Sequence, residues 1–150
     1  MVSIRRMTEA DLAAVRALLV QLGYEIDIGE VERRYRMVTE AEDHAAVVGE
    51  QDGRIAAFLH VYGRPAFEKP PEAVVQALVV DQPFRGTGIG QAMMRAAEAW
   101  ALARGFTSMA LSSGVSRLQA HAFYDALGYR QEATSYLLRK RLEADTGHCM

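Results

Sequence analysis

The sequence contains a single cysteine, Cys149, so no disulfide can form within the chain, and this fits a reducing compartment. No run of about 18 apolar residues is present, so we expect no membrane span. The N-terminal stretch has no secretory signal pattern, because charged side chains interrupt it: Arg5, Arg6, Glu9 and Asp11. Together these absences predict a cytoplasmic protein without a membrane partner.

An excess of basic residues is also missing, since the formal net charge of the chain is −2. Proteins that coat nucleic acid usually carry a basic patch, so we expect no nucleic-acid partner. We expect no metal centre either. His148 and Cys149 place two ligand types side by side, but the other histidines show no spacing that would complete a site: His44, His60 and His121.

The length of 150 residues and an apolar fraction of 50% predict one compact domain with a core of its own. No internal repeat, linker or low-complexity segment divides the sequence. We therefore predict a single domain over residues 1–143, followed by a polar tail, residues 144–150, that frays.

The first half of the sequence predicts a strand, two helices and a hairpin. Thr8 is the expected N-cap of the first helix, with Asp11 in its first turn, and Gly23 is its stop signal. The pair Asp52-Gly53 is one of the strongest short hairpin signals. The expected elements are a strand at 2–7, helices at 8–23 and 30–40, and a hairpin over 44–63.

The second half alternates strands and helices. Residues 73–81 form a nearly unbroken apolar run, which is typical of a strand that is covered on both faces. We expect a helix at 91–105, a strand at 106–113, a helix at 116–128 with a capping box of Ser116 and Gln119, and a last strand at 134–142. This order predicts an α/β fold in which a mixed sheet has helices on both faces.

Three glycines lie within five positions, Gly86, Gly88 and Gly90, between the apolar run and a helix. A dinucleotide fingerprint needs a further glycine where Gln91 or Met93 stands, and a phosphate loop needs a lysine after Gly90. A tight turn alone would need only one or two glycines. Three bare positions at a helix start let backbone N–H groups approach an anion, which favours a pyrophosphate cradle.

Two motifs carry a resemblance to a known family. The segment "VVDQPFRGTGIGQAMM" closely resembles the acetyl-CoA loop of the GNAT N-acetyltransferases, whose pattern is filled by Arg85, Gly88 and Gly90. The segment "AHAFYDALGYR" resembles a later motif of the same family, at Ala120, Phe123, Tyr124, Gly128 and Tyr129. The resemblance implies a single-domain GNAT-like α/β fold with a mixed, mostly antiparallel central sheet flanked by helices on both faces.

The resemblance also implies roles for these positions, with acetyl-CoA as the acetyl donor. The backbone of Leu78, Val79 and Val80 would pair with the pantetheine arm, and an N–H of Leu78 or Val79 would hold the thioester oxygen. Tyr124 would be the general acid. The pyrophosphate would lie on the amides of Arg85, Gly86, Thr87, Gly88, Ile89, Gly90 and Gln91. A homodimer is a further expectation, because dimers are common in the family.

The sequence departs from the family pattern at two positions. Many relatives carry a glutamate in the strand before the loop, where this chain has Gln76, so the general base stays open among Glu72, His60, Glu25 and water. An asparagine that relatives often have is replaced by Arg117, which either reaches the CoA phosphate or the acceptor, or is an exposed first-turn residue.

The resemblance implies acetyl transfer to a primary amine of a small molecule or peptide, by direct attack. Candidate acceptors are a polyamine, an aminoglycoside-like amine, an amino acid or a peptide. Four acidic residues of the expected acceptor loops would suit a cationic amine: Glu25, Asp27, Glu30 and Glu68. Two alternatives remain, a CoA-sensing or interaction domain without turnover, supported by Gln76, and an unusual nucleotide-binding loop.

Overall fold

A computed structural model describes residues 1–143 and divides the chain into two compact units, Met1–Ser112 and a second unit from Ser113 onward. Residues 144–150, with His148 and Cys149, lie outside the described part. The first unit contains β1 (Ser3–Arg6), α1 (Leu12–Leu22), α2 (Ile28–Glu40), β2 (His44–Gln51), β3 (Arg54–Arg64), β4 (Glu72–Val80), α3 (Ile89–Ala103) and β5 (Met109–Ala110), with short 3₁₀ turns at Glu9–Asp11 and Gln82–Phe84. The second unit contains α4 (Leu118–Ala126).

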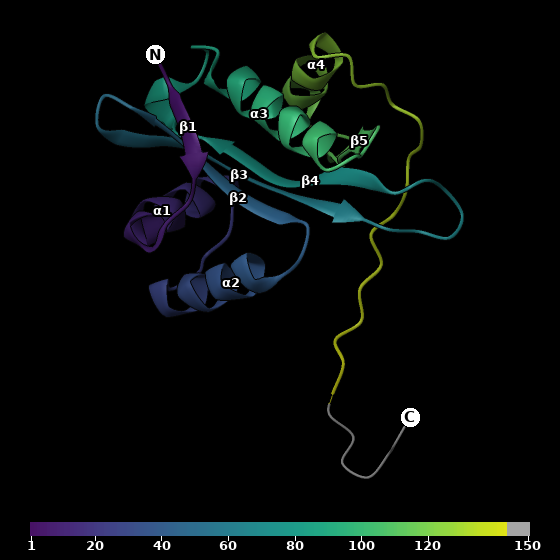
Figure 1. Cartoon of the computed structure of the whole chain (residues 1–150), viewed down its shortest axis with the longest axis horizontal. Coiled ribbons are helices and arrows are strands. Elements are labelled where there is room, and N and C mark those ends of the chain that lie inside the picture. The colour runs from purple at the N-terminus through teal and green to yellow at the C-terminus, as the bar shows by residue number, and fades with distance from the viewer. Residues whose placement is uncertain (144–150) are drawn as a thin grey trace. The chain divides into compact units, whose positions relative to one another are not determined.

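The strands form one mixed sheet in the order β1-β2-β3-β4-β5. Neighbouring strands are antiparallel except for β4 and β5, which run parallel with Ala73 opposite Met109. Helices α1 and α2 cover one face of the sheet and α3 covers the other (Figure 1). The predicted α/β class, with a mixed, mostly antiparallel sheet between helices, is therefore confirmed.

Apolar side chains fill both faces of the sheet. Val15 and Leu18 of α1 belong to a buried cluster with Val48 and Phe58 of the sheet. On the other face, Gly49 lies so close to α3 that an added Cβ would be 3.0 Å from Sδ of Met93. Each fully buried large apolar side chain stabilises the fold by about 1.5–3 kcal/mol, so these two layers make the first unit a firm platform.

Local signals in the sequence are confirmed at several positions. Asp52 and Gly53 have φ values of 54° and 73°, which both belong to the left-handed region that a two-residue hairpin turn requires. Gly23 ends α1 with a φ of 110°. Thr8 caps the 3₁₀ turn Glu9–Asp11, where its N–H donates to Asp11 Oδ2 at 2.8 Å, whereas the N-cap of α1 itself is Asp11 rather than the predicted Thr8.

Two predictions in the second half are wrong. Residues 134–142 form no strand, because strand-forming residues need a partner strand and this segment pairs with none within residues 1–143; Tyr136, Leu137 and Leu138 are exposed. The capping box at Ser116 is also absent, since α4 begins at Leu118 with Arg117 as its N-cap and no side chain caps it.

The predicted strand at 106–113 is reduced to the two residues Met109 and Ala110. Ser116 instead lies in the turn before α4, where Arg117 N–H donates to Gly114 O at 3.0 Å. Within residues 1–143, no helix combines the length and apolar character needed to cross a bilayer.

Candidate active site

The outer edge of β4 is open along its second half. Strand β5 pairs with Ala73 and Val74, and within the first unit no strand pairs with this edge beyond them. The N–H of Asp81 donates to Ala56 O of β3 at 2.7 Å. Because N–H groups alternate in direction along a strand, those of Leu78 and Val80 point away from β3. They therefore face the open edge.

A β-bulge at Gln76 produces this orientation. Ala73 N–H donates to Ser108 O at 3.0 Å, on the outer side, and regular alternation from there would point the Leu78 N–H toward β3. The register slips, however, because His60 lies opposite Ala77 while Val61 lies opposite Val75. The extra residue is Gln76, which is exposed. One inserted residue thus reverses the direction of every later N–H group in β4.

Sequence reasoning missed the bulge, although Gln76 is the one polar residue in the apolar run from Ala73 to Val80. The bulge bears on the expected choice between Leu78 and Val79 as the donor to a thioester oxygen. The Val79 N–H has the same direction as that of Asp81 and points toward β3. The geometry favours Leu78.

The turn after β4 leaves the start of α3 bare. Gly86 and Gly88 have φ values of 78° and 88°, and a Cβ added at either would meet nothing within 4 Å. Gly88 caps α3, and its carbonyl accepts from Ala92 N–H at 3.1 Å. The N–H groups of the first helical turn have no partner inside the helix, so they are available to an anion.

The three glycines have different reasons to be glycine. Gly86 and Gly88 adopt left-handed backbone that other residues enter only with strain, so the turn itself explains them. Gly90 lies inside α3 and has no positive φ, and there glycine costs about 1 kcal/mol relative to alanine. At Gly90, the need for a backbone without a side chain, rather than a turn conformation, therefore accounts for the glycine.

Arg85 lies over the end of β4. Its Nε donates to Val80 O at 3.0 Å and its Nη2 donates to Gln21 Oε1 at 3.3 Å. The positive charge expected at the rim of the glycine turn therefore lies at the junction of the open edge and the turn. Thr87 Oγ1 donates to Phe84 O and closes the turn on its other side.

In the second unit, Tyr124 lies on α4 between two aromatic rings. The ring centroids of Phe123 and Tyr129 are 5.1 Å and 6.0 Å from that of Tyr124, both edge-on. Burial raises the pKa of the phenol, and the positive charge of the exposed Arg117 opposes this shift. The hydroxyl hydrogen-bonds to no residue within 1–143, so Tyr124 keeps a free proton to donate at neutral pH.

The candidate bases differ in their surroundings. The Glu72 carboxylate accepts from Arg64 Nη2 at 2.6 Å and lies 3.1 Å from Lys69 Nζ, and these contacts lower its pKa. A carboxylate paired with two cations is a weak base. His60 is part-buried beside His44, and burial together with the His44 charge lowers the His60 pKa to about 4. Glu25 is exposed, and among residues 1–143 it has no partner.

The acidic residues of the expected acceptor loops fall into two groups. Asp27 Oδ1 accepts from Glu30 N–H at 2.9 Å and caps α2. Glu30 pairs with Arg33 at 2.5 Å and with Arg34 at 3.0 Å. These two carboxylates have structural partners. Within the described part of the chain, Glu25 and Glu68 have none, which leaves them available to a cationic molecule.

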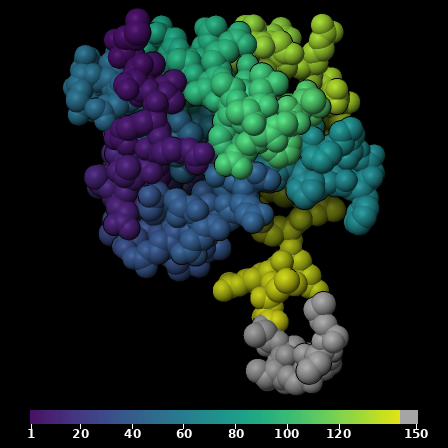
Figure 2. Space-filling view, viewed as in Figure 1, coloured from purple at the N-terminus to yellow at the C-terminus, as the bar shows by residue number. Residues whose placement is uncertain are grey.

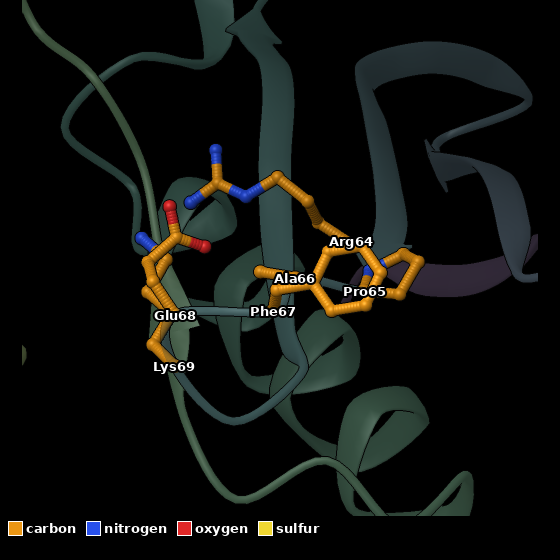
Figure 3. A pocket seen from close by; sticks show the side chains of 6 residues that line it. All are labelled: Arg64, Pro65, Ala66, Phe67, Glu68 and Lys69. Atoms are coloured by element: carbon orange, nitrogen blue, oxygen red, sulfur yellow. The ribbon is translucent and has the colours of Figure 1, made fainter.

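Glu68 belongs to a hollow of about 550 Å³ formed by the loop from Arg64 to Lys69, between β3 and β4. Figure 2 shows this loop as a teal projection at the surface. In Figure 3 the Arg64 guanidinium and the Glu68 carboxylate point to one side of the loop, away from the Phe67 ring. The hollow is open to solvent, and Phe67 is fully exposed.

The sequence profile of the Acetyltransferase (GNAT) family matches residues 12–129. The chain belongs to the GNAT acetyltransferase family. The match includes both sequence motifs, so the resemblance inferred from Arg85, Gly88, Gly90 and Tyr124 is confirmed.

Two kinds of relative extend this GNAT assignment. The chain is 28% identical over 145 residues to an aminoglycoside N(6′)-acetyltransferase type 1 of Stenotrophomonas maltophilia, covering 94% of each chain. It is 28% identical over 142 residues to an uncharacterised N-acetyltransferase of Bacillus subtilis, covering 93% of this chain and 99% of the relative. Family and relatives together support N-acetyltransferase activity.

Solved structures share the GNAT fold. An aminoglycoside 6′-N-acetyltransferase from Acinetobacter baumannii has a TM-score of 0.84 at 19% identity, with 95% of this chain and 100% of that chain covered. The aminoglycoside N-acetyltransferase AAC(6′)-Iy in complex with CoA has a TM-score of 0.86 at 20% identity, with 95% and 96% covered. At this identity the two structures show that the fold is shared, and CoA is bound in the second of them.

Proposed function

We propose that this chain transfers the acetyl group of acetyl-CoA to a primary amine of a small cationic molecule, with an aminoglycoside as the first acceptor to test. The observation that carries the proposal is the open edge of β4, which leads directly into the bare first turn of α3. The named activity of the Stenotrophomonas maltophilia relative supports the acceptor class.

The proposed acetyl-CoA site uses backbone groups of the first unit. The amides of a pantetheine arm would pair with Leu78 and Val80, whose N–H groups face the open edge. The pyrophosphate would lie on the N–H groups between Arg85 and Gln91, where a helix N-terminus favours negative charge. The Arg85 guanidinium adds a positive charge at the same place. Arg117 stays a proposed phosphate or acceptor contact.

The proposed reaction is a direct attack. The nitrogen of a neutral amine bonds to the thioester carbonyl carbon, the carbon–sulfur bond breaks, and the nitrogen loses one proton while the sulfur gains one. The Leu78 N–H stabilises the negative charge that develops on the carbonyl oxygen. By the family resemblance, Tyr124 would donate the proton to the sulfur. A thiol has a pKa of about 8.5 and a phenol one of about 10, which burial raises further in Tyr124, so the transfer runs uphill in water and depends on the positioning of the two groups.

The proton on the attacking amine leaves through water in this proposal. Gln76 cannot accept a proton at neutral pH, and the Glu72 carboxylate is held by Arg64 and Lys69. A cationic substrate whose amines have lowered pKa values reduces the demand on a base. This requirement fits a molecule that carries several neighbouring amines, because each positive charge disfavours the next.

The proposal is tested by thiol release from acetyl-CoA with a panel of amines: aminoglycosides, polyamines, amino acids and short peptides. Release with one class establishes the enzyme and its acceptor.

The exposed Gln76 on the bulge favours a second candidate, a CoA sensor without turnover. No release with any amine, together with tight CoA binding, would favour the sensor. Thermal protection by NAD or ATP but not by CoA would favour a nucleotide-binding loop instead.

The remaining expectations stay predictions. A homodimer, the cytoplasmic location and the absence of a nucleic-acid or membrane partner follow from composition and family resemblance. The expected single domain over residues 1–143 also stays a prediction. Size-exclusion chromatography with light scattering would measure the oligomeric state directly.

A further inference from the structure

The side-chain amide of Gln21, in the last turn of α1, contacts three residues of the turn that follows β4. Its Oε1 accepts from Gln82 N–H at 3.1 Å and from Arg85 Nη2 at 3.3 Å. Its Nε2 donates to Asp81 Oδ1 at 2.7 Å. We call these four residues the Gln21 clamp. A single amide thus holds a turn that lies 60 to 64 residues further along the chain.

The other side of the turn is attached to β3. Asp81 N–H donates to Ala56 O at 2.7 Å, and Asp81 Oδ2 lies 3.5 Å from Arg54 Nη2. The Arg54 guanidinium also lies 5.4 Å from the centroid of the Phe84 ring. The turn is therefore held between α1 and the β2–β3 hairpin, and Gln21 provides the contact on the α1 side.

The clamp spans the junction of the two halves of the proposed acetyl-CoA site. Arg85 Nε donates to Val80 O, the last residue of the open edge, at 3.0 Å, and Gly86 follows Arg85 in the chain. A ligand that contacts both the edge and the glycine turn needs them in one fixed arrangement. If this arrangement is already held before binding, less conformational entropy is lost when the ligand binds.

A purely structural role is the simpler alternative, because Gln21 is exposed and exposed hydrogen bonds contribute little to stability. That role would change thermal stability and leave ligand affinity unchanged. The contacts favour a positioning role, because the Nε2 donor and the Oε1 acceptor of this amide both bind the same turn and neither binds a residue of α1.

We propose that Gln21 is a positioning residue for acetyl-CoA, which fixes the turn from Asp81 to Arg85 so that the open edge of β4 and the glycine turn bind one ligand. The inference rests on the proposed function, because it names CoA as that ligand. Gln21 touches no reacting atom and acts through Arg85 and the main chain of Gln82.

The chain offers a matched set of variants. Gln21→Glu keeps the oxygen that accepts from Gln82 N–H and Arg85 Nη2, but it loses the donor to Asp81 and places two carboxylates side by side. Asp81→Asn keeps an oxygen that accepts from Gln21 and loses the long, exposed contact with Arg54 Nη2 at 3.5 Å, so it serves as the control for that loss. The double variant Q21E/D81N restores the hydrogen bond with donor and acceptor exchanged. Rescue by the double variant is a result that loss of a surface residue would not produce.

Two measurements are made on each full-length variant: the dissociation constant of CoA by calorimetry, and amide hydrogen exchange over residues 82–91 without ligand. We expect Gln21→Glu to weaken CoA binding about five- to tenfold and to speed exchange, as the loss of one or two hydrogen bonds predicts. We expect Asp81→Asn and Q21E/D81N to bind CoA within about twofold of the natural chain.

Unchanged CoA affinity in Gln21→Glu would overturn the inference. A loss of affinity in Gln21→Glu that persists in Q21E/D81N would overturn it too. Faster exchange with unchanged affinity would also overturn it, because the clamp would then be structural only. Failure of the natural chain to bind CoA would overturn the proposed function and the ligand named here. The exchange measurement in the ligand-free protein separates that failure from a failure of the clamp itself.

Discussion

His44 Nδ1 and His60 Nε2 lie 3.0 Å apart on the adjacent strands β2 and β3, so the N–H of one imidazole donates a hydrogen bond to the ring nitrogen of the other. The ring of Tyr62 stacks on His44 with centroids 5.1 Å apart and an interplanar angle of 12°. Alternation along β3 places His60 and Tyr62 on the same face of the sheet as Phe58. His60 lies opposite Ala77, beside the bulge that orients Leu78.

This pair predicts a pH-dependent stability. The pKa of His60 is about 4 in the folded chain, lowered from 6.5 by burial and by the charge of His44. Between these values the unfolded chain binds a proton that the folded chain does not. The stability contribution is therefore present above about pH 6.5 and is lost as the pH falls toward 4.

The variant His60→Gln removes this titration and keeps a hydrogen-bonding group beside His44. We expect the unfolding free energy of the natural chain to fall by about 2 kcal/mol more than that of the variant between about pH 7.5 and pH 5. Urea unfolding at the two pH values measures the difference. Equal losses in the two proteins would show that His60 is accessible to protons in the folded state.

Gly88→Trp is expected to abolish CoA binding in a folded protein, because the new side chain fills the space at the start of α3. Gly105 provides a matched control at the other end of the helix. It has the same φ of 88° and an added Cβ would also meet nothing within 4 Å. Both tryptophan variants should lose about 1–2 kcal/mol of stability from left-handed backbone. Calorimetric titration with CoA that shows equal binding in both would contradict the cradle.

Tyr124→Phe is expected to lower kcat by a factor of about 100 or more and to leave the dissociation constant of CoA unchanged, because only the proton donor is lost. Tyr136→Phe is the control, since Tyr136 is exposed. Steady-state thiol release measures kcat. Full activity of the Tyr124 variant would mean that the phenol serves only to pack against Phe123 and Tyr129.

Glu72→Gln is expected to keep kcat within about twofold, because a carboxylate held by Arg64 and Lys69 is not the base. The same change should lower stability by about 1 kcal/mol through the loss of these ion pairs. Thiol release and thermal unfolding on the same sample measure both effects. A large loss of kcat at unchanged stability would return Glu72 to the reaction.

Glu25→Gln and Glu68→Gln are each expected to raise the KM for a cationic acceptor about two- to fivefold, with a smaller effect at high salt. Glu30→Gln is the control, because its carboxylate is already paired with Arg33 and Arg34. The comparison needs the acceptor class found in the thiol-release panel. An equal rise in KM for all three variants would indicate a general charge effect rather than contact with the substrate.

Residue type alone determined the local features of this chain. Gly23, the Asp52-Gly53 pair, Gly86 and Gly88 adopt left-handed backbone, and this conformation depends on the residue itself and its nearest neighbours. The same local constraint makes the glycine turn recognisable as a motif, so the family and the α/β class could be inferred before any contact was known.

Only the tertiary structure decided which groups the site exposes. The outward direction of the Leu78 N–H depends on the bulge at Gln76, which exists only through pairing with β3. Glu72 is a weak base because the Arg64 guanidinium, on the neighbouring strand β3, pairs with its carboxylate. Residues 134–142 have a strand-like sequence but no partner strand among the described residues. Each outcome depends on how the strands pair, and local propensity does not contain that information.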